Sequence, residues 1–483
     1  MSLIFNARIV TPDWALAAVA AYVLLIPLAL TSLPNVTPHD AARVMQCALF
    51  TLCAFAMVVH CWRHRQGIGA GPHTEVNRWM IGAGICAGVS VIAAPLPLWA
   101  MREVALWVGM AFVAWTVAVA GGAARRRVFE AALLATLAYN ALVLGISLTS
   151  IFAGQVPWAI DLELGYSNVR FLNHVQTVMI PFAVAGALQV GLSVRRQAIL
   201  DVTLASTFAL LFASGGRATA LAIAMGAALA WFAARTATGS ALRRLGRTAV
   251  WGYLTYVAIF LLLPSALGLG VRSGLLDRAG ETGSVTARLY LWRLAVEQIG
   301  LAPWFGIGPM HFAHHPNREA AHPHNAYLQL AVEVGVPFFL LAMGGLWMMG
   351  RAWVARIRSL DRIPAAEEGA AWLVCLLAVL FDAMASGNLV MPVSQVWIAL
   401  AVGFSIRWWW STNRANLFEA RPPTAGHRFL PFVCACVGAS LSVWLLLVSV
   451  SEIGRLDETL KASRELSPTA GRINPRYWSS GWF

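Results

Sequence analysis

The chain has 483 residues, of which 59% are hydrophobic and 12% are charged. A soluble globular domain carries about 25% charged residues, so this composition excludes an ordinary soluble fold and predicts a protein whose solvent is the lipid bilayer. The net charge of +13 does not predict a nucleic-acid partner, because the arginines form short clusters between apolar segments rather than a basic patch or tail.

Apolar segments that could cross a bilayer recur along the whole chain. One crossing as a helix needs about 20 residues. The first such segment is longer than the core of roughly 7–15 residues that a signal peptide has, so it is predicted to be a retained helix. We predict an all-α, polytopic integral membrane protein with about 12–13 transmembrane helices. The thirteen predicted spans lie near residues 14–33, 42–62, 79–95, 103–121, 129–152, 174–193, 198–213, 217–235, 248–269, 325–349, 369–387, 391–410 and 429–450.

Basic residues predict the orientation of these helices. With the N-terminus inside, the inside segments hold 21 arginines, and the outside connections between helices hold nine. Positive residues favour the cytoplasmic side, so this bias predicts an odd number of spans and an external C-terminal tail. The predicted division of the chain is helices one to nine in 1–269, an outer segment at 270–324, helices ten to thirteen in 325–451, and a short outer tail at 452–483.

Two outer segments are long, at about 153–173 and about 270–324. The second contains a predicted helix from Thr286 to Ile299, with Ser284 or Thr286 as its N-cap. Helical spacing places four apolar residues on one face, which predicts a helix lying on the membrane surface. These residues are Leu289, Trp292, Val296 and Ile299.

Five arginines at the outer face are candidates for binding an anionic substrate. Guanidinium groups bind phosphate through paired hydrogen bonds, and a setting of low dielectric constant strengthens the contact. The alternative is that they reach toward lipid phosphates. Contact with lipid phosphates is least expected for Arg217, because this residue lies between a glycine pair and a predicted helix in SGGRAT. The five candidates are Arg43, Arg170, Arg217, Arg288 and Arg293.

Five histidines cluster just before the tenth predicted helix. Their spacing fits no standard zinc pattern and few carboxylates are near, so no metal site is predicted. In the segment His322-Pro323-His324-Asn325, the proline predicts an extended approach to the helix that follows. A histidine at that helix mouth could take a proton from a hydroxyl group, although an interfacial histidine without chemistry is the alternative. The cluster comprises His311, His314, His315, His322 and His324.

Acids and cysteines give weaker signals. Glu333 and Asp382 lie inside predicted spans, where an acid is a functional hypothesis by default. Glu333 would lie about 13 Å deeper than His324 along a continuous helix, so we expect it to pair with a buried arginine or to support helix packing. Asp161 and Glu163 form a short acidic pair that a metal-dependent glycosyltransferase could use. The seven cysteines all lie in or beside apolar segments, which predicts packing rather than disulfides or zinc.

Several of these segments together resemble the superfamily of O-antigen ligases, O-antigen polymerases and protein O-oligosaccharyltransferases of bacterial envelopes. The resemblance covers most of residues 40–390, and HPHN followed by LQ and Glu333 is its most specific part. The segments that carry it are HDAARVMQ, GYSNVRFLNHVQT, SGGRATALA, TARLYLWRLAVEQIGLAPWFGIGPMHF and HPHNAYLQLAVEVGVP.

The resemblance implies a glycosyltransferase of the inner membrane that takes a glycan from undecaprenyl diphosphate on the periplasmic side, without a metal or other cofactor. It implies that His324 is the catalytic base and that Arg217 and Arg288 hold the diphosphate. Arg170, Arg43 and Arg293 would assist in the same role. His322, Asn325 and Glu333 would support the site.

The acceptor stays open. Ligases of this superfamily are expected to have twelve spans, whereas thirteen are predicted here, with an external tail. Lipid A–core is the leading acceptor, and protein hydroxyls (Ser/Thr) and a growing glycan are the rivals. A transporter or flippase of lipid-linked sugars is the alternative from another class, but transporters usually place polar residues near the midplane and often show repeats. A structural membrane scaffold is a third option, but it would not explain why the HPHN motif lies on the same face as the outer arginines.

Overall fold

A computed structural model describes residues 13–26, 36–63, 74–157, 162–272, 283–315, 317, 319–361, 363–413, 426–456, 458, 475–481 and 483. Within these ranges the fold is all-helical, and they contain no strand. The helices are α1 (Asp13–Leu25), α2 (Pro38–Arg63), α3 (Thr74–Ala93), α4 (Pro97–Val119), α5 (Gly122–Phe152), α6 (Val169–Val190), α7 (Val194–Ala213), α8 (Arg217–Ala233), α9 (Arg235–Tyr256), α10 (Leu263–Ala266), α12 (Gly283–Leu301), α13 (Ala326–Val334), α14 (Val336–Arg358), α15 (Ile363–Asp382), α16 (Pro392–Thr412) and α18 (Gly426–Ile453).

The helices confirm a polytopic membrane protein. Nine of those in the described ranges are long and apolar enough to cross a membrane, and three shorter apolar helices accompany them. Each of the thirteen predicted intervals overlaps a helix. A π-helical segment, Val257–Leu262, joins α9 to α10 without ending the helix.

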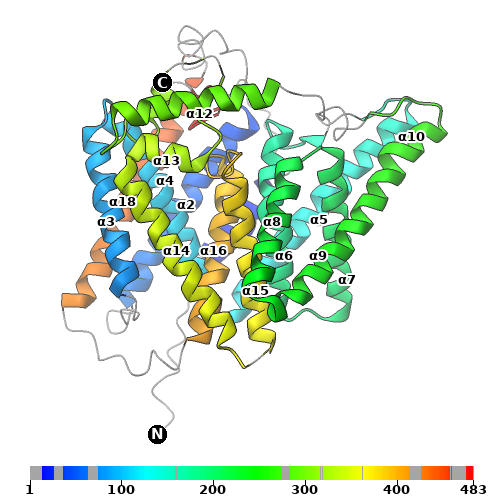
Figure 1. Ribbon diagram of the computed structural model, residues 1–483, viewed down its shortest axis with the longest axis horizontal. Helices are drawn as coiled ribbons and strands as arrows, with labels where there is room; N and C mark the ends of the chain where they lie inside the picture. Colours follow the sequence, from blue (N-terminus) through cyan, green and yellow to red (C-terminus); the bar gives the residue numbers. More distant parts are fainter. Residues whose placement is uncertain are drawn as a thin grey trace.

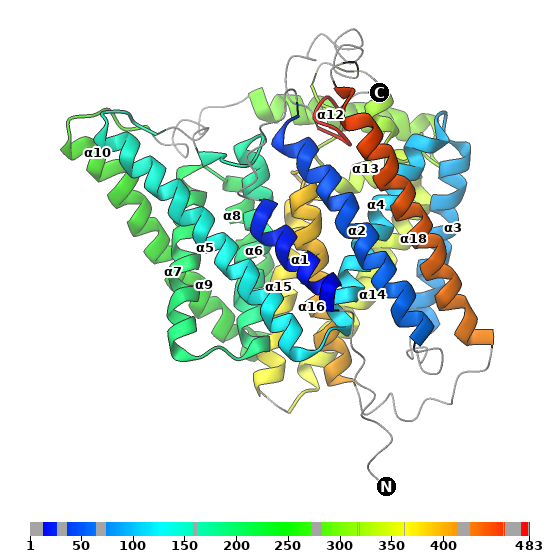
Figure 2. The same cartoon turned by 180° about the vertical axis from the view of Figure 1, so that it is seen from behind.

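Most of the helices run roughly parallel in one bundle, and α12 lies across one end of it (Figure 1). The short helix α13 and the C-terminal residue lie at the same end, as the view from behind also shows (Figure 2). The helix predicted in the long outer segment is therefore present as α12. It extends three residues further at its start and two at its end than the predicted Thr286–Ile299.

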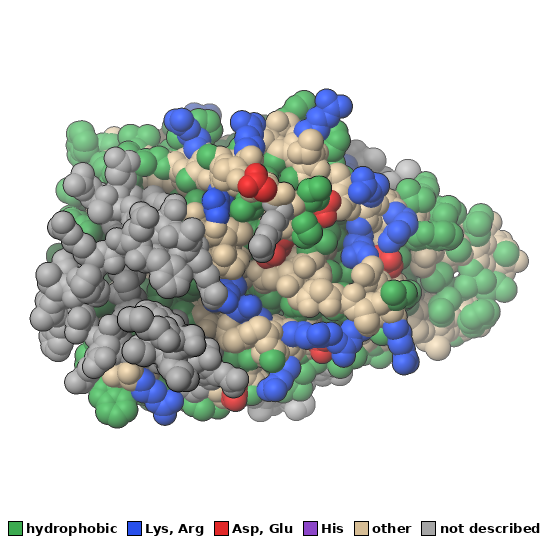
Figure 3. Space-filling model, turned by 90° about the horizontal axis from the view of Figure 1, so that it is seen from below, with side chains coloured by type: hydrophobic (Ala, Val, Ile, Leu, Met, Phe, Trp, Pro, Cys, Tyr) green, Lys and Arg blue, Asp and Glu red, His purple; other side chains and the backbone are tan. Residues whose placement is uncertain are grey.

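The opposite end of the bundle carries many arginine side chains and few acids (Figure 3). These arginines lie at the helix ends that the charge pattern assigns to the inside. Exposed examples are Arg63, Arg127, Arg195, Arg196, Arg235 and Arg351. The positive-inside rule would place this arginine-rich end in the cytoplasm.

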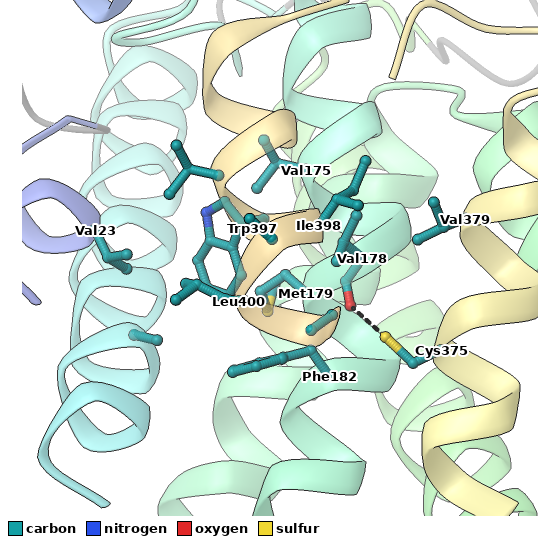
Figure 4. Close-up of a cluster of buried hydrophobic side chains, with 14 of the residues drawn as sticks. Val23, Val175, Val178, Met179, Phe182, Cys375, Val379, Trp397, Ile398 and Leu400 are labelled. Carbon is teal, nitrogen blue, oxygen red and sulfur yellow. Dashed lines mark hydrogen bonds between the residues drawn. The ribbon is translucent and has the colours of Figure 1, made fainter. Parts of the chain in front are cut away.

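The core around α6 holds the bundle together. Phe182 packs edge-on against Trp372, Trp397 and Phe404 of α15 and α16, and the Cys375 thiol approaches the Val178 carbonyl oxygen at 3.7 Å (Figure 4). All seven cysteines fall in described helices and are free. The close packing of α15 against α6 places the C-terminal end of α15 beside the N-terminal end of α6, where the candidate site lies.

One predicted helix is divided in two. Residues 325–349 were expected to form one span, but Gly335, with φ of +103°, separates α13 from α14. A Cβ atom at this position would lie 2.3 Å from the Trp304 carbonyl oxygen, so the close approach also requires glycine. Glu333 therefore ends a short helix at the outer face and does not lie deep in a continuous span.

The buried face of α12 also differs from the predicted apolar stripe. Leu291 and Ala295 are buried against α13 and the preceding loop. Leu289 and Val296 of the predicted stripe are each 57% exposed and point away from the protein. Trp292 of the same stripe lines the cavity described below, and Ile299 packs against the cluster around Leu291, so the stripe is divided between an exposed and a buried side.

Candidate functional site

A cavity of about 1630 Å³ opens at the end of the bundle that carries α12. Small-molecule sites usually occupy about 300–1,000 Å³, so this cavity can hold a larger ligand. Its lining comes from the start of α6, the turn between α7 and α8, α12, the loop before α13 and the end of α15. Exposed apolar side chains of Leu221, Met225 and Met384 form part of the wall. The cavity therefore suits a ligand with both polar and apolar parts.

A network of buried hydrogen bonds joins the start of α6 to the turn before α8. The Asn173 amide donates to the Ser214 hydroxyl at 2.8 Å, and Thr219 donates to the Asn173 carbonyl oxygen at 3.0 Å. Gly216 lies so close that an added Cβ would be 2.4 Å from a methyl group of Leu211. This turn makes Arg217 the first residue of α8, where the helix N-terminus favours an anion.

Three of the predicted arginines line this cavity. They are Arg170 at the start of α6, Arg217 at the start of α8 and Arg288 on α12. Burial lowers the pKa of Arg288, and the neighbouring Arg170 and Arg217 lower it further, against the opposing effect of Asp382. The acids among the lining residues are Asp382 and Glu319. The cavity is thus positively charged near the N-terminal ends of α6 and α8, and it suits a phosphate-bearing ligand.

His324 lies in the cavity wall in an uncommon backbone conformation. Its φ of +51° is left-handed, which costs about 1 kcal/mol or more for a residue other than glycine. The approach to α13 is therefore a sharp turn and not the extended segment predicted. The Asn325 side chain caps α13 by accepting from the backbone N–H of Tyr327 and Leu328, and Trp292 donates to the Pro323 carbonyl oxygen at 3.1 Å. Strained backbone held by such contacts is often found at functional sites.

The two histidines of HPHN lie together. Their ring centroids are 4.1 Å apart, and the His322 Nδ1 atom accepts from the His324 backbone N–H at 3.2 Å. Burial lowers the pKa of His324 to about 3, and the nearby guanidinium groups of Arg288 and Arg170 contribute. His324 is therefore neutral at pH 7 and has a nitrogen that can accept a proton.

Beside His324 lies a polar pair that includes an acid singled out in the sequence. The Nδ1 atom of His174 on α6 is 3.7 Å from an Asp382 carboxylate oxygen, and that oxygen accepts from the Ser386 hydroxyl at 2.7 Å. Asp382 is buried and its other oxygen has no hydrogen-bond partner among the described residues. His174 was not predicted, because a single histidine at the start of an apolar helix carries no distinguishing signal.

Residues 202–343 match the family model described as O-antigen ligase. This region of the chain is similar to the O-antigen ligase family. The matched region contains Arg217, Arg288 and His324, and it leaves Arg170 and Asp382 outside. The chain has no match among curated proteins. Members of this superfamily are glycosyltransferase-type enzymes that act on lipid-linked glycans.

Arg43, a predicted diphosphate-binding residue, does not line the cavity. It is completely buried, and its five N–H groups are all used within the protein. They donate to Gln46, Gln395 and the carbonyl oxygens of Val390, Arg476 and Tyr477 at 2.7–3.3 Å. Arg43 has therefore no donor left for a diphosphate and serves to join α2 to the C-terminal residues.

Arg293 is also outside the cavity. Its side chain is 82% exposed and pairs with Glu297 one turn along α12 at 2.9 Å. The two arginines of TARLYLWR are five residues apart, which places them about 140° apart around a helix of 3.6 residues per turn. Arg288 therefore faces the cavity while Arg293 faces away.

The other three histidines of the predicted cluster lie outside the cavity. His311 accepts from the Leu96 backbone N–H at 3.0 Å, and the His314 Nδ1 atom is 2.8 Å from the Phe483 carbonyl oxygen. Neither lines the cavity, nor does His315. The described residues contain no group of three or more metal-ligating side chains. Asp161 lies outside the described residues.

Glu333 has the buried arginine partner that its position predicted. The Arg476 Nη2 atom is 2.6 Å from a Glu333 carboxylate oxygen, and both side chains are buried. The partner comes from the C-terminal tail, for which no role was predicted. Asn325 lines the cavity and caps α13, while Glu333 lies at the other end of that helix.

Proposed function

We propose that the chain is a glycosyltransferase that moves an O-antigen oligosaccharide or polysaccharide from undecaprenyl diphosphate to lipid A–core. The observation that carries this proposal is the convergence of Arg170, Arg217, Arg288 and His324 on one cavity at the outer end of a membrane bundle. The match of residues 202–343 to the O-antigen ligase family supports the same reaction class.

The donor diphosphate would bind between the three arginines and the N-terminus of α8. Guanidinium groups match the geometry of phosphate oxygens, and a helix N-terminus adds favourable partial charge. The exposed apolar residues Leu221 and Met225 lie further along α8 on the cavity wall. They offer a path on which the polyprenyl chain stays in contact with apolar surface while the diphosphate remains at the cavity mouth.

The transfer would proceed by attack of an acceptor hydroxyl on the anomeric carbon of the donor glycan. His324 takes the hydroxyl proton, the new C–O bond forms, and the bond between the anomeric carbon and the diphosphate oxygen breaks. The electron pair of that bond leaves on undecaprenyl diphosphate, where the arginines offset the growing charge. The arginines provide this charge stabilisation, so the proposed mechanism requires no metal or other cofactor.

Donor binding would also prepare His324 for its role. In the empty cavity the arginines lower the pKa of His324, which makes the imidazole a weak base. The negative charge of a bound diphosphate would offset Arg170 and Arg288 and raise the pKa toward neutrality. His324 would then be a better proton acceptor when the donor is present, which disfavours proton removal from an acceptor in its absence.

The orientation supports a periplasmic site in a bacterial inner membrane. Arginines gather at the end of the bundle opposite α12 (Figure 3), and that end would face the cytoplasm by the positive-inside rule. The cavity would then open to the periplasm. A transporter or flippase of lipid-linked sugars would move the donor without breaking its bond to phosphate, so release of undecaprenyl diphosphate separates the two classes.

The test uses a strain deleted for this chain and complemented with the wild type or with His324→Ala. Lipopolysaccharide gels and blots of periplasmic glycoproteins are read together with the amount of lipid-linked glycan. We expect the deletion to lose capped lipopolysaccharide and accumulate lipid-linked glycan, and only the wild type to restore the ladder. A ladder that persists while a protein loses its glycan would make protein hydroxyls the acceptor. Loss of chain-length extension alone would indicate a polymerase, and full rescue by His324→Ala would remove the catalytic assignment.

A further inference from the structure

The C-terminal segment at residues 475–481 is a buried part of the outer face. Tyr477 and Trp478 are 1% and 2% exposed. Ser479 donates to the Asp40 carboxylate from both its backbone N–H and its hydroxyl, each at 2.7 Å, and Trp478 donates to Glu452 at 2.9 Å. Pro475 reaches the cavity and forms part of its lining. This segment therefore belongs to the body of the protein and touches the candidate site.

Arg476 is the charged centre of this segment. It is 2% exposed, and its Nη2 atom lies 2.6 Å from a Glu333 oxygen on α13 and 3.5 Å from a Glu103 oxygen on α4. With its amide turned so that oxygen faces the guanidinium, Gln329 accepts from Arg476 at 2.6 and 2.8 Å. One guanidinium thus joins two buried carboxylates and two residues of α13. Without it, the two acids would face each other in a setting of low dielectric constant.

Glu333 links Arg476 to the loops around the cavity. One Glu333 carboxylate oxygen accepts from the Phe312 backbone N–H at 3.2 Å, and the Glu333 carbonyl oxygen accepts from Gly308 at 2.9 Å. These contacts bind the end of α13 to the loop that follows α12. The other end of the same nine-residue helix begins at Asn325, directly after His324. Because so short a helix moves as one body, a displacement of Glu333 also displaces the His324 turn.

We propose that Arg476 is a positioning residue of the transferase: through Glu333 it holds α13, and with it His324, in place against the cavity. The inference rests on the proposed function, since it concerns the efficiency of the transfer step. Arg476 does not line the cavity, so it touches neither the diphosphate nor the acceptor. Its loss should lower the rate of transfer and leave donor binding by Arg170, Arg217 and Arg288 nearly unchanged.

The experiment compares the purified full-length wild type with Arg476→Ala, Arg476→Lys and Glu333→Gln. Arg455→Ala is the matched control, because Arg455 is an exposed arginine just after α18. Each protein is assayed for transfer from an undecaprenyl-diphosphate glycan to lipid A–core, giving kcat, the donor KM and the melting temperature in the same detergent. Misplacement of a catalytic group can cost up to about 100-fold, so we expect kcat of Arg476→Ala to fall by roughly 10- to 100-fold with a donor KM within about threefold.

Rescue separates positioning from general stability. Arg476→Lys keeps the positive charge beside Glu333 and should recover most of the lost kcat, and Arg476→Ala combined with Glu333→Gln should lose less than the product of the two single losses. If Arg476→Ala does not fold, the Lys and Gln variants carry the same test. A wild-type kcat in Arg476→Ala, or a kcat that follows only the melting temperature without rescue by lysine, would overturn the inference. An inactive wild-type protein would instead overturn the proposed function.

Discussion

The two arginines of α12 give the sharpest test of the donor site. Arg288→Ala removes a half-buried guanidinium from the cavity wall, where Arg170 and Arg217 are close enough to lower its pKa. Arg293→Ala removes the same chemical group five residues later, where the side chain is 82% exposed and paired with Glu297. Both variants change the net charge by the same amount on the same helix. A difference between them therefore measures location and not charge alone.

The expected magnitude follows from the contacts that each arginine can make. A hydrogen bond to a charged group contributes about 1.5–3 kcal/mol when it is partly shielded from water. At about 1.4 kcal/mol for each factor of ten, loss of Arg288 should lower kcat/KM by roughly 10- to 150-fold. The exposed Arg293–Glu297 pair contributes little, so Arg293→Ala should stay within about twofold of the wild type.

The assay is transfer of glycan from the undecaprenyl-diphosphate donor to lipid A–core by purified protein, with donor and acceptor varied separately. We expect Arg288→Ala to raise the donor KM, lower kcat, or both, and to leave the acceptor KM unchanged. The melting temperatures should agree within a few degrees. Equal activity of Arg288→Ala and Arg293→Ala would refute the assignment of the diphosphate to this cavity, as would an effect of Arg288→Ala confined to the acceptor.

Four further predictions concern His324 and Arg43. His324→Ala should lower the single-turnover rate by roughly 10²- to 10⁴-fold, as loss of a general base does, with donor affinity retained in a binding assay. Arg43→Ala should leave buried acceptors unpaired and lower the stability to thermal unfolding by roughly 2–4 kcal/mol, with little change in donor KM. The pKa of His324 is about 3 in the folded protein against 6.5 for an ordinary histidine, so the unfolded chain binds more protons and stability should fall as the pH drops below about 6.5. The acid limb of kcat/KM should likewise lie well below pH 6.5, and it should move upward in Arg288→Ala, because removing a nearby positive charge raises the pKa of His324.

Much of the fold and of the site could be predicted because both depend on simple one-dimensional signals. Apolar segments of about 20 residues mark helices, and arginine clusters mark their inner ends. Arg170, Arg217 and His324 all lie where an apolar segment begins or ends on the outer side. Since the outer ends of a bundle meet at one face, residues far apart in sequence can be expected to gather there, and these three line one cavity.

The division between α13 and α14 was missed for a local reason. A hydropathy pattern averages over many residues, so one glycine does not interrupt the apolar segment around 325–349. The left-handed φ of Gly335 and its contact with Trp304 appear only when α13 folds back against the loop after α12. The consequence for function is large, because the break keeps Glu333 at the outer face, where it meets Arg476.

Arg43 and Arg217 explain why the roles of outer arginines could not be sorted from sequence. Each lies at the outer end of a helix in a segment that resembles the same family, so the local signal is equivalent. Their difference depends on where the five N–H groups of a guanidinium find acceptors. For Arg43 these include the carbonyl oxygens of Arg476 and Tyr477, more than 430 positions away. A buried arginine whose donors are all used inside the protein is structural, whereas one on the cavity wall can meet a phosphate, and only tertiary contacts distinguish the two.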